Sequence, residues 1–298
     1  MFSILIPTYN YDCTSLVRAL HQQGEQLRAE TQGKFDFEII VADDCSTDAE
    51  SVRKNRAINE LERCRLWESP RNLGRAAIRN RLAELAAFPY LVFIDSDAQA
   101  DESPDYLRLY WQYAPTCPVV CGGARNVHSL PSPKMALRFR YEQWLDKKRV
   151  AEVRRRQPYS EFSTFNFLVA RDTFLSLRFN EQCKHYGYED VDFGLRLKQA
   201  GIPIKHIDNW LIHAGLDENH SFLEKTETAL RTLHSLDREI QQGSAVGRMA
   251  ARLESLGLKG AMRCFHTVFR GMERKNLLGK HPSLTVLSIY KLGYYSSL

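Results

Sequence analysis

Two carboxylates that lie two residues apart, Asp95 and Asp97, are the most informative residues of the chain. They directly follow an apolar run, residues 90–94, which predicts a buried β-strand. Ligands of open α/β sheets collect beyond the carboxyl ends of the strands. Mg²⁺ takes one or two carboxylates together with phosphate oxygens. The pair therefore predicts either a divalent metal that binds a diphosphate or, in the plainer interpretation, a solvated turn.

Three more apolar runs precede this strand, and polar residues follow each of them. The runs are residues 2–7, 37–42 and 64–67, and amphipathic segments at 14–30 and from 75 onward predict helices between them. Strands and helices that alternate at this spacing are typical of a parallel sheet. Right-handed crossovers place the ends of such strands at one edge. We therefore expect the polar residues after the strands to line one cleft.

Five stretches of sequence, taken in order, carry a resemblance to a known family. They are ILIPTYN (4–10), IIVADDCSTD (39–48), NLGRAAIRN (72–80), VFIDSDA (92–98) and GYEDVDFGLRL (187–197). Together they resemble the family-2 glycosyltransferases, and the likeness covers roughly residues 1–215. The resemblance implies an α/β fold of the GT-A, Rossmann-like type, with a mixed, mostly parallel sheet flanked by helices. The chain departs from the pattern at Cys45, where the family often has glycine, and at Ala98, where an acidic residue is frequent.

The resemblance implies a role for the residues that follow the strands. It assigns nucleotide binding to Pro7, Thr8, Tyr9, Asp43, Asp44, Asn72, Gly74, Arg79, Asp95 and Ser96. Asp44 would bind the imide of a uracil-like base, Asp97 would ligate Mg²⁺ or Mn²⁺, and Asp95 and His213 would complete the metal site. The alternatives are structural: Asp43 and Asp44 as parts of a turn and helix cap, Arg79 as a helix-face cation, and His213 as a core histidine.

A second acidic cluster, Glu189 and Asp190, begins an amphipathic stretch that predicts a helix. By resemblance, Asp190 is the general base that takes the proton of an acceptor hydroxyl, and Glu189 binds the acceptor or orients Asp190. Asp192 is expected to support the start of the helix. The structural alternative is that all three acids only interact with the positive end of the helix dipole.

These motifs predict an inverting glycosyltransferase that uses a nucleotide sugar, with UDP as the expected carrier. The expected acceptor is a saccharide or lipid-linked saccharide in polysaccharide or glycoconjugate biosynthesis. One alternative is a sugar-phosphate nucleotidyltransferase, which would need a Gly-rich phosphate loop where Thr8 to Tyr11 stand. The other alternative is a non-catalytic nucleotide- or carbohydrate-binding subunit.

Composition places these motifs in a larger organisation. We expect a nucleotide-sugar-binding half at residues 1–100, an acceptor-binding half of the same domain at 101–220, and a basic helical extension at 221–298. The seven cysteines show no regular spacing and no CxxC pair, which argues against a disulfide framework or a zinc site. With no charged leader and no stretch of about 20 apolar residues, the expected location is the cytoplasm.

Basic residues are concentrated near the carboxyl terminus. Residues 245–298 contain nine Lys or Arg and two acidic residues, a net charge of +7, whereas the whole chain carries +5. Their alternation with apolar residues predicts either helices that pack on the catalytic region or a peripheral contact with an anionic membrane. No recognition motif for nucleic acid accompanies them. A second basic run, residues 147–156, is either a loop that meets phosphate or an anionic acceptor, or a solvated helix face.

Overall fold

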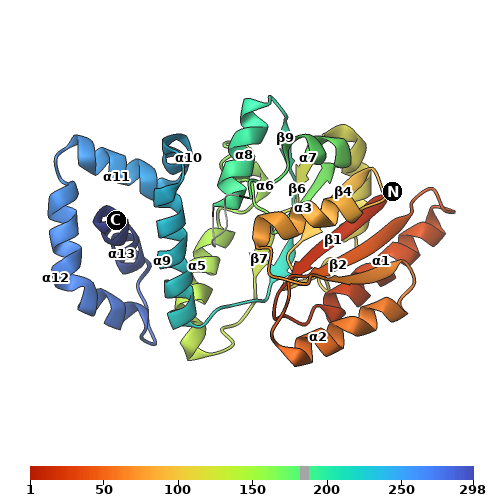
Figure 1. The fold of residues 1–298 in the computed structure, drawn as a ribbon, viewed down its shortest axis with the longest axis horizontal. Coiled ribbons are helices and arrows are strands. Elements are labelled where there is room, and N and C mark those ends of the chain that lie inside the picture. The colour runs from red at the N-terminus through yellow and green to blue at the C-terminus, as the bar shows by residue number, and fades with distance from the viewer. Residues whose placement is uncertain (182–187) are drawn as a thin grey trace.

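A seven-stranded sheet forms the centre of the larger part of the molecule (Figure 1). The structure is a computed structural model that describes residues 1–181 and 188–298. The strand order is β3 (Cys64–Glu68), β2 (Phe37–Asp43), β1 (Phe2–Thr8), β4 (Tyr90–Ile94), β8 (Asn166–Ala170), β6 (Val119–Cys121) and β9 (Ile204–His206). Only β8 runs against its neighbours among these described strands. The expectation of a mixed, mostly parallel sheet is confirmed.

Helices cover both faces of this sheet. One face packs against α1 (Thr14–Glu30) and α4 (Tyr106–Tyr113), and the other packs against α3 (Arg75–Leu85), α7 (Arg171–Leu177) and α8 (Glu189–Gln199). Side chains of β1 alternate between the two cores: Ile4 and Ile6 face the first, and Leu5 faces the second. A strand that is buried on both faces needs apolar residues at successive positions, which explains its continuous apolar run. Shorter helical elements are α2 (Ala49–Asn55), α6 (Ala151–Arg154), η1 (Arg56–Glu60), η2 (Ala114–Thr116) and η3 (Pro133–Met135).

A second, three-stranded sheet joins distant parts of the chain at the end of β4. It contains β5 (Ala98–Gln99), β10 (Leu211–His213) and β7 (Ala124–Asn126), with β10 in the middle. In this sheet His213 pairs with Ala98 on one side and with Asn126 on the other. The backbone N–H of Ala214 also donates to the carbonyl of Asp97 at 2.9 Å. The pairing therefore fixes His213 beside the strand-end acids.

Five helices follow the sheet region and lie to one side of it (Figure 1): α9 (Asn219–Ser235), α10 (Arg238–Gly243), α11 (Ala245–Ser255), α12 (Lys259–Leu277) and α13 (Leu284–Ser297). They pack on α5 (Ala136–Asp146) through a core that contains Leu137, Phe222, Leu277 and Tyr290. Asn219 reinforces this contact: its Oδ1 accepts from the N–H of Leu137 at 2.8 Å, and its Nδ2 donates to the carbonyl of Gly279 at 3.0 Å. The expected carboxyl-terminal helices are present. Within the described residues, no helix has both the length and the apolar character needed to span a bilayer.

Cys45, where the chain departs from the family pattern, has a left-handed backbone with φ of 63°. A side chain in this conformation costs about 1–2 kcal/mol, whereas glycine adopts it without steric penalty. We expect Cys45→Gly to raise the free energy of unfolding by up to about 1 kcal/mol, because the greater flexibility of glycine in the unfolded chain offsets part of the gain. Cys45→Ala is the control, since it removes the thiol and keeps Cβ. Equal stabilities of the two variants in urea denaturation would contradict this explanation.

Candidate active site

Two adjoining cavities lie at the carboxyl ends of β1, β2 and β4. The first has a volume of about 590 Å³, and the second about 480 Å³. Of the ten residues to which the resemblance assigns nucleotide binding, nine line the first cavity: Pro7, Thr8, Tyr9, Asp44, Asn72, Gly74, Arg79, Asp95 and Ser96. The second cavity is lined by Glu189, Asp190 and His213. Asp95 and Asp97 line both, so the strand-end acids lie where the two cavities meet.

Asn10 holds together the two loops that border the first cavity. Its Oδ1 accepts from the backbone N–H of Thr47 at 2.7 Å and of Asp48 at 2.9 Å, and its own N–H donates to Ser46 Oγ at 2.7 Å. Asp48 in turn accepts from the N–H of Ser51 and caps α2. The loops after β1 and β2 are thus fixed to each other, and Tyr9 remains 49% exposed at the wall of the cavity.

Asp44 and Asp43 have different surroundings. The Asp44 carboxylate accepts from the N–H of Leu73 at 2.6 Å and of Gly74 at 2.9 Å, which ties the β2 loop to the start of α3. Burial raises the pKa of Asp44, and these two N–H groups partly oppose the shift. Asp43 instead faces its own loop, where its Oδ1 accepts from the N–H of Ser46 at 2.7 Å. Asp43 therefore supports the turn after β2 and does not line the first cavity, whereas Asp44 both supports the loop and lines that cavity.

Arg79 is not a solvated helix-face cation, because only 2% of its surface is exposed. Its Nη2 donates to Asp95 Oδ1 at 2.5 Å, and its Nη1 lies 4.0 Å from Glu189 Oε1. Asp95 thus already has a counter-ion from the protein. This pairing reduces the negative charge that Asp95 can offer to a metal, and it links the first cavity to the Glu189 side of the second.

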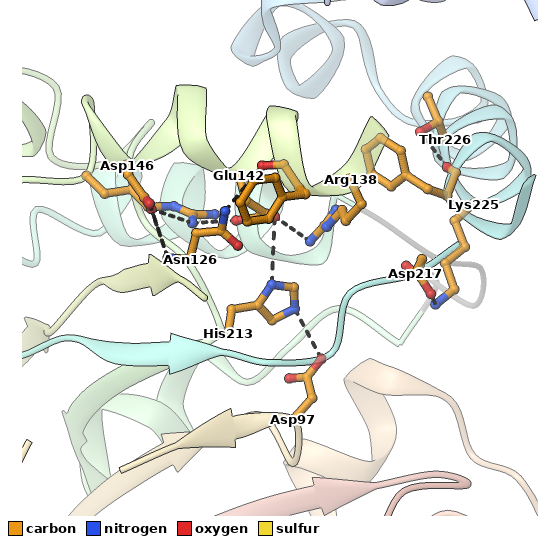
Figure 2. Close-up of polar contacts among 12 residues, drawn as sticks. Asp97, Asn126, Arg138, Glu142, Asp146, His213, Asp217, Lys225 and Thr226 are labelled. Carbon is orange, nitrogen blue, oxygen red and sulfur yellow. Dashed lines mark hydrogen bonds and ion pairs between the residues drawn. The ribbon is translucent and has the colours of Figure 1, made fainter. Parts of the chain in front are cut away.

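Asp97 and His213 lie next to each other at the junction of the two cavities (Figure 2). His213 Nε2 is 3.1 Å from Asp97 Oδ2. Burial alone would raise the pKa of Asp97, but the hydrogen bond and charge of His213, with Arg75 and Arg138 nearby, hold that pKa below its ordinary value. Gly215 allows this approach because a Cβ there would come within 2.2 Å of Asp97 Oδ2.

The donor atoms around Asp97 suit a divalent cation. Asp97 Oδ1 is buried and has no hydrogen-bond partner, and the neighbouring imidazole adds a nitrogen donor of a kind that Mn²⁺ accepts. In the described parts of the chain, no three His, Cys, Asp or Glu side chains are assembled around one point. Asp97 and His213 can each offer one donor atom, so a cation here would take its other ligands from a bound molecule or from water.

Glu189 and Asp190 begin α8 with opposite electrostatic surroundings. Burial would raise the pKa of Glu189, but Arg75 and Arg79 outweigh it and lower the pKa. For Asp190, burial and then the charge of Glu189 raise the pKa to about 7, although Asp190 Oδ1 accepts from the N–H of Val191 at 2.8 Å. A carboxylate with this pKa is suited to accept a proton near neutral pH. Gly187, which opens the quoted motif, lies outside the described residues.

The remaining charged residues near the site are mostly structural. Asp192 is buried and accepts from Arg196 at 3.4 Å, one turn further along α8, as expected for support of the helix start. In the basic run 147–156, Arg154 is also buried and donates to the carbonyls of Gly122 at 3.1 Å and Ile207 at 2.7 Å. Arg154 is therefore not a solvated cation: it ties the end of β6 to the end of β9, and it also lines the second cavity together with Lys148 and Arg149.

Residues that sequence patterns did not single out also line the cleft. Arg75 and Lys225 line both cavities, and Arg138 lines the second. Arg75 Nη1 lies 3.4 Å from Glu189 Oε1, and Lys225 Nζ donates to Asp217 Oδ1 at 2.6 Å. Arg75 stands inside the motif NLGRAAIRN, so its position next to Gly74 was a usable signal. Arg138 and Lys225 belong to no motif that we recognised.

Comparison with known proteins decides the family. Residues 3–177 match glycosyl transferase family 2. The chain belongs to this family. It is 30% identical over 246 residues to the validoxylamine A glucosyltransferase of Streptomyces hygroscopicus subsp. limoneus. The aligned region covers 74% of this chain and 53% of that protein. An uncharacterized glycosyltransferase of Haemophilus influenzae is 33% identical over 100 residues, 33% of this chain and 36% of that protein. The chain thus spans about half the length, or less, of these two relatives.

A solved structure supports the GT-A-like fold. The mannosyltransferase PcManGT from Pyrobaculum calidifontis, in complex with GDP-Man and Mn²⁺, matches with a TM-score of 0.52 at 14% sequence identity. The match covers 99% of this chain and 84% of that one. The likeness therefore extends over the sheet region and the carboxyl-terminal helices together.

Proposed function

We propose that this family-2 member is an inverting glycosyltransferase. It moves a sugar from a nucleoside diphosphate to a hydroxyl of a saccharide or lipid-linked saccharide, in polysaccharide or glycoconjugate biosynthesis. One observation carries the proposal: Asp190, with its pKa raised to about 7, lines a cavity that shares Asp95 and Asp97 with the strand-end cavity. A base and a site for a diphosphate therefore border the same cleft. The names of the similar proteins, a glucosyltransferase and a mannosyltransferase, agree with this class of reaction.

The first cavity is the proposed donor site, and a uridine diphosphate sugar is the proposed donor. Tyr9 presents an exposed ring against which a base can stack. Each oxygen of the Asp44 carboxylate accepts one backbone N–H, which leaves lone pairs to accept the imide N–H of a uracil ring. The bonds to Leu73 and Gly74 also hold the carboxylate in place before the nucleotide binds.

Asp97 and His213 are the proposed ligands of Mg²⁺ or Mn²⁺. When bound, the cation would stabilise the negative charge that develops on the diphosphate as it leaves. The similar mannosyltransferase was solved with Mn²⁺ and GDP-Man, which supports the use of a divalent metal. Asp95, paired with Arg79, is left to contact the ribose or a water molecule of the metal.

Asp190 is the proposed general base of the reaction. As the acceptor oxygen attacks the anomeric carbon, the bond to the diphosphate breaks on the opposite face, and the diphosphate leaves with the electron pair. Asp190 takes the hydroxyl proton. Arg75 and Arg79 keep Glu189 ionised, and the charge of Glu189 helps to raise the pKa of Asp190. Neighbouring carboxylates with separated pKa values can serve different roles, here orientation for Glu189 and proton transfer for Asp190.

The two alternatives fit the site less well. A nucleotidyltransferase would need a Gly-rich phosphate loop after β1, but residues 8–13 contain no glycine, and Asn10 ties this loop to the next one. A non-catalytic binding subunit would have no use for a carboxylate whose pKa lies near neutrality in the cleft. Measurable hydrolysis of a sugar nucleotide would separate that subunit from an enzyme.

We also propose that the outer faces of α11 and α12 contact an anionic membrane, which we expect to be the inner face of the cell membrane. Only three residues of α12 are buried: His266, Glu273 and Leu277. Large apolar side chains of this helical pair are instead 43% to 68% exposed: Met249, Leu256, Leu258, Phe265, Val268 and Met272. Helices that only packed on the catalytic region would hide such side chains.

Charge completes the argument for a lipid surface. Arg252 and Lys275 are exposed and lie one turn from Leu256 and Met272, respectively. Apolar side chains with neighbouring cations are typical of helices that lie in the headgroup region of an anionic bilayer. Such a contact would bring the enzyme to a lipid-linked acceptor.

The role of Asp190 can be tested by replacing its carboxylate. We expect Asp190→Asn to lower kcat by roughly 10²–10⁴-fold with little change in nucleotide affinity, because the amide keeps the shape but cannot accept the proton. Steady-state transfer or hydrolysis with UDP-sugars measures the first quantity, and calorimetric titration with UDP and Mn²⁺ measures the second. The control is Asp192→Asn, which changes an acid on the same helix. Normal turnover in Asp190→Asn would remove this residue as the base.

The pKa of Asp190 also predicts a pH profile. Because Asp190 is protonated below its pKa of about 7, kcat/KM should fall about tenfold per pH unit on the acid side and level off above pH 7. In Asp190→Asn this fall on the acid side should be absent, and the low residual kcat/KM should not change with pH. An acid limb that is centred near pH 4, the ordinary range of a carboxyl group, would contradict the assignment.

Membrane contact can be tested by co-sedimentation with vesicles of phosphatidylglycerol and phosphatidylcholine. We expect the protein to sediment with them at low salt and to be released at high salt, because surface charges are screened over about 8 Å at physiological ionic strength. Val268→Glu combined with Met272→Glu should prevent sedimentation, whereas Leu130→Glu, a change at an exposed leucine of another segment, should not. If the protein stays in the supernatant at low salt, the proposed contact of α11 and α12 with an anionic membrane is wrong.

A further inference from the structure

We propose that Glu142 is a positioning residue that holds the His213 ring so that its Nε2 faces Asp97 and the metal. This inference rests on the proposed function, in which Asp97 and His213 bind a divalent cation. Glu142 lies on α5, has no exposed surface, and belongs to none of the sequence motifs. Figure 2 shows His213 between the carboxylates of Asp97 and Glu142.

The surroundings of Glu142 are unusual for a buried carboxylate. Arg138 Nη2 lies 2.7 Å from its Oε1, and Arg149 Nη1 lies 2.5 Å from its Oε2. Two arginines thus pair with this one buried carboxylate, one with each of its oxygens. A buried charge costs several kcal/mol unless it is well paired, so an apolar residue would be cheaper if this position served only packing.

The ring of His213 also lies near the Glu142 carboxylate. His213 Nδ1 lies 3.8 Å from Glu142 Oε1, while Nε2 lies 3.1 Å from Asp97 Oδ2. His213 Nδ1 is buried and has no hydrogen-bond partner, and Glu142 Oε1 is buried with only the ion pair to Arg138. A small rotation of the ring would let Nδ1–H donate to Oε1. With its proton on Nδ1 and directed to Glu142, the ring offers the lone pair of Nε2 to a cation beside Asp97.

The scaffold around Glu142 fixes this geometry. Asn126 pairs with His213 in the small sheet, and its N–H donates to Asp146 Oδ1 at 3.1 Å, one turn beyond Glu142 on α5. Asn126 Nδ2 also donates to the carbonyl of Phe139 at 3.2 Å. The ring of Phe165 meets the His213 ring edge-on, with centroids 5.4 Å apart. Helix α5 and strand β10 are thus held together on both sides of the Glu142–His213 contact.

The test is the affinity for Mn²⁺ in the presence of UDP, measured by electron paramagnetic resonance on the full chain. We expect Glu142→Gln to weaken Mn²⁺ binding about tenfold, as is common when the carboxylate partner of a metal-binding histidine is removed. Glu273→Gln is the matched control, because Glu273 is also a buried carboxylate beside a histidine, with its Oε2 2.7 Å from His266 Nδ1, but it lies on α12 and lines neither cavity. It should bind Mn²⁺ as the wild type does.

A double-mutant cycle shows whether Glu142 acts through His213. In a His213→Ala background, Glu142→Gln should cause no further loss of Mn²⁺ affinity. Because glutamine removes the charge that pairs with the half-buried Arg138 and Arg149, Glu142→Asp serves as a second variant, which keeps the charge but withdraws it from the ring. It should retain the melting temperature more fully than Glu142→Gln and still bind Mn²⁺ more weakly than the wild type.

The outcomes separate this inference from the proposed function. Wild-type affinity in both Glu142 variants, or an additive loss in the His213→Ala background, would overturn the positioning role alone. A wild-type protein that binds no Mn²⁺ with UDP, or binds it equally well after His213→Ala, would overturn the metal assignment and this inference with it. A loss confined to the Glu142 variants and absent in Glu273→Gln supports the role.

Discussion

The pairing of Ala98 with His213 is the interaction on which the site depends. It joins a two-residue strand that directly follows Asp97 to a strand more than a hundred residues later in the chain. Because side chains alternate across a strand, a shift of one residue in this pairing would turn His213 away from Asp97. The same strand pairs with β7 on its other side, so Asn126, α5 and Glu142 are aligned to the strand-end acids through one short sheet.

Arginine placement decides what each acid in the cleft can do. Arg79 pairs with Asp95 and lies near Glu189, while Arg75 reaches Glu189 from the more exposed side. These cations keep Glu189 charged, and that charge adds to burial in raising the pKa of Asp190. Two consecutive acids thus acquire different proton affinities, because Arg75 and Arg79 lower the pKa of Glu189, whereas at Asp190 burial and the charge of Glu189 outweigh the effect of Arg75.

Local patterns predicted much of the sheet and of the cleft. The apolar runs are β1 to β4, and residues after them, such as Thr8, Asp44 and Asn72, line one cavity because parallel strands end at one edge. Side chains whose role depends on distant partners were not predictable in this way. Arg154 and Lys148 belong to the same basic run, yet Arg154 is buried against carbonyls and Lys148 lies over the ring of Trp144. Glu142 has a local partner in Arg138, four residues earlier on α5, but its approach to His213 is set only by tertiary packing.

Through Lys225, the carboxyl-terminal helices form part of the wall of the cleft. Lys225 belongs to α9, lines both cavities, and pairs with Asp217 at the end of the chain segment that follows His213. The same helix supplies Phe222, Leu223, Leu230 and Leu233 to the cores shared with α12, α13 and α11. A chimaera that exchanged everything after β10 would therefore replace one wall of the cleft along with the helical region. A graft meant to transfer only the outer helices has to keep α9, together with the residues it packs against, from the same parent.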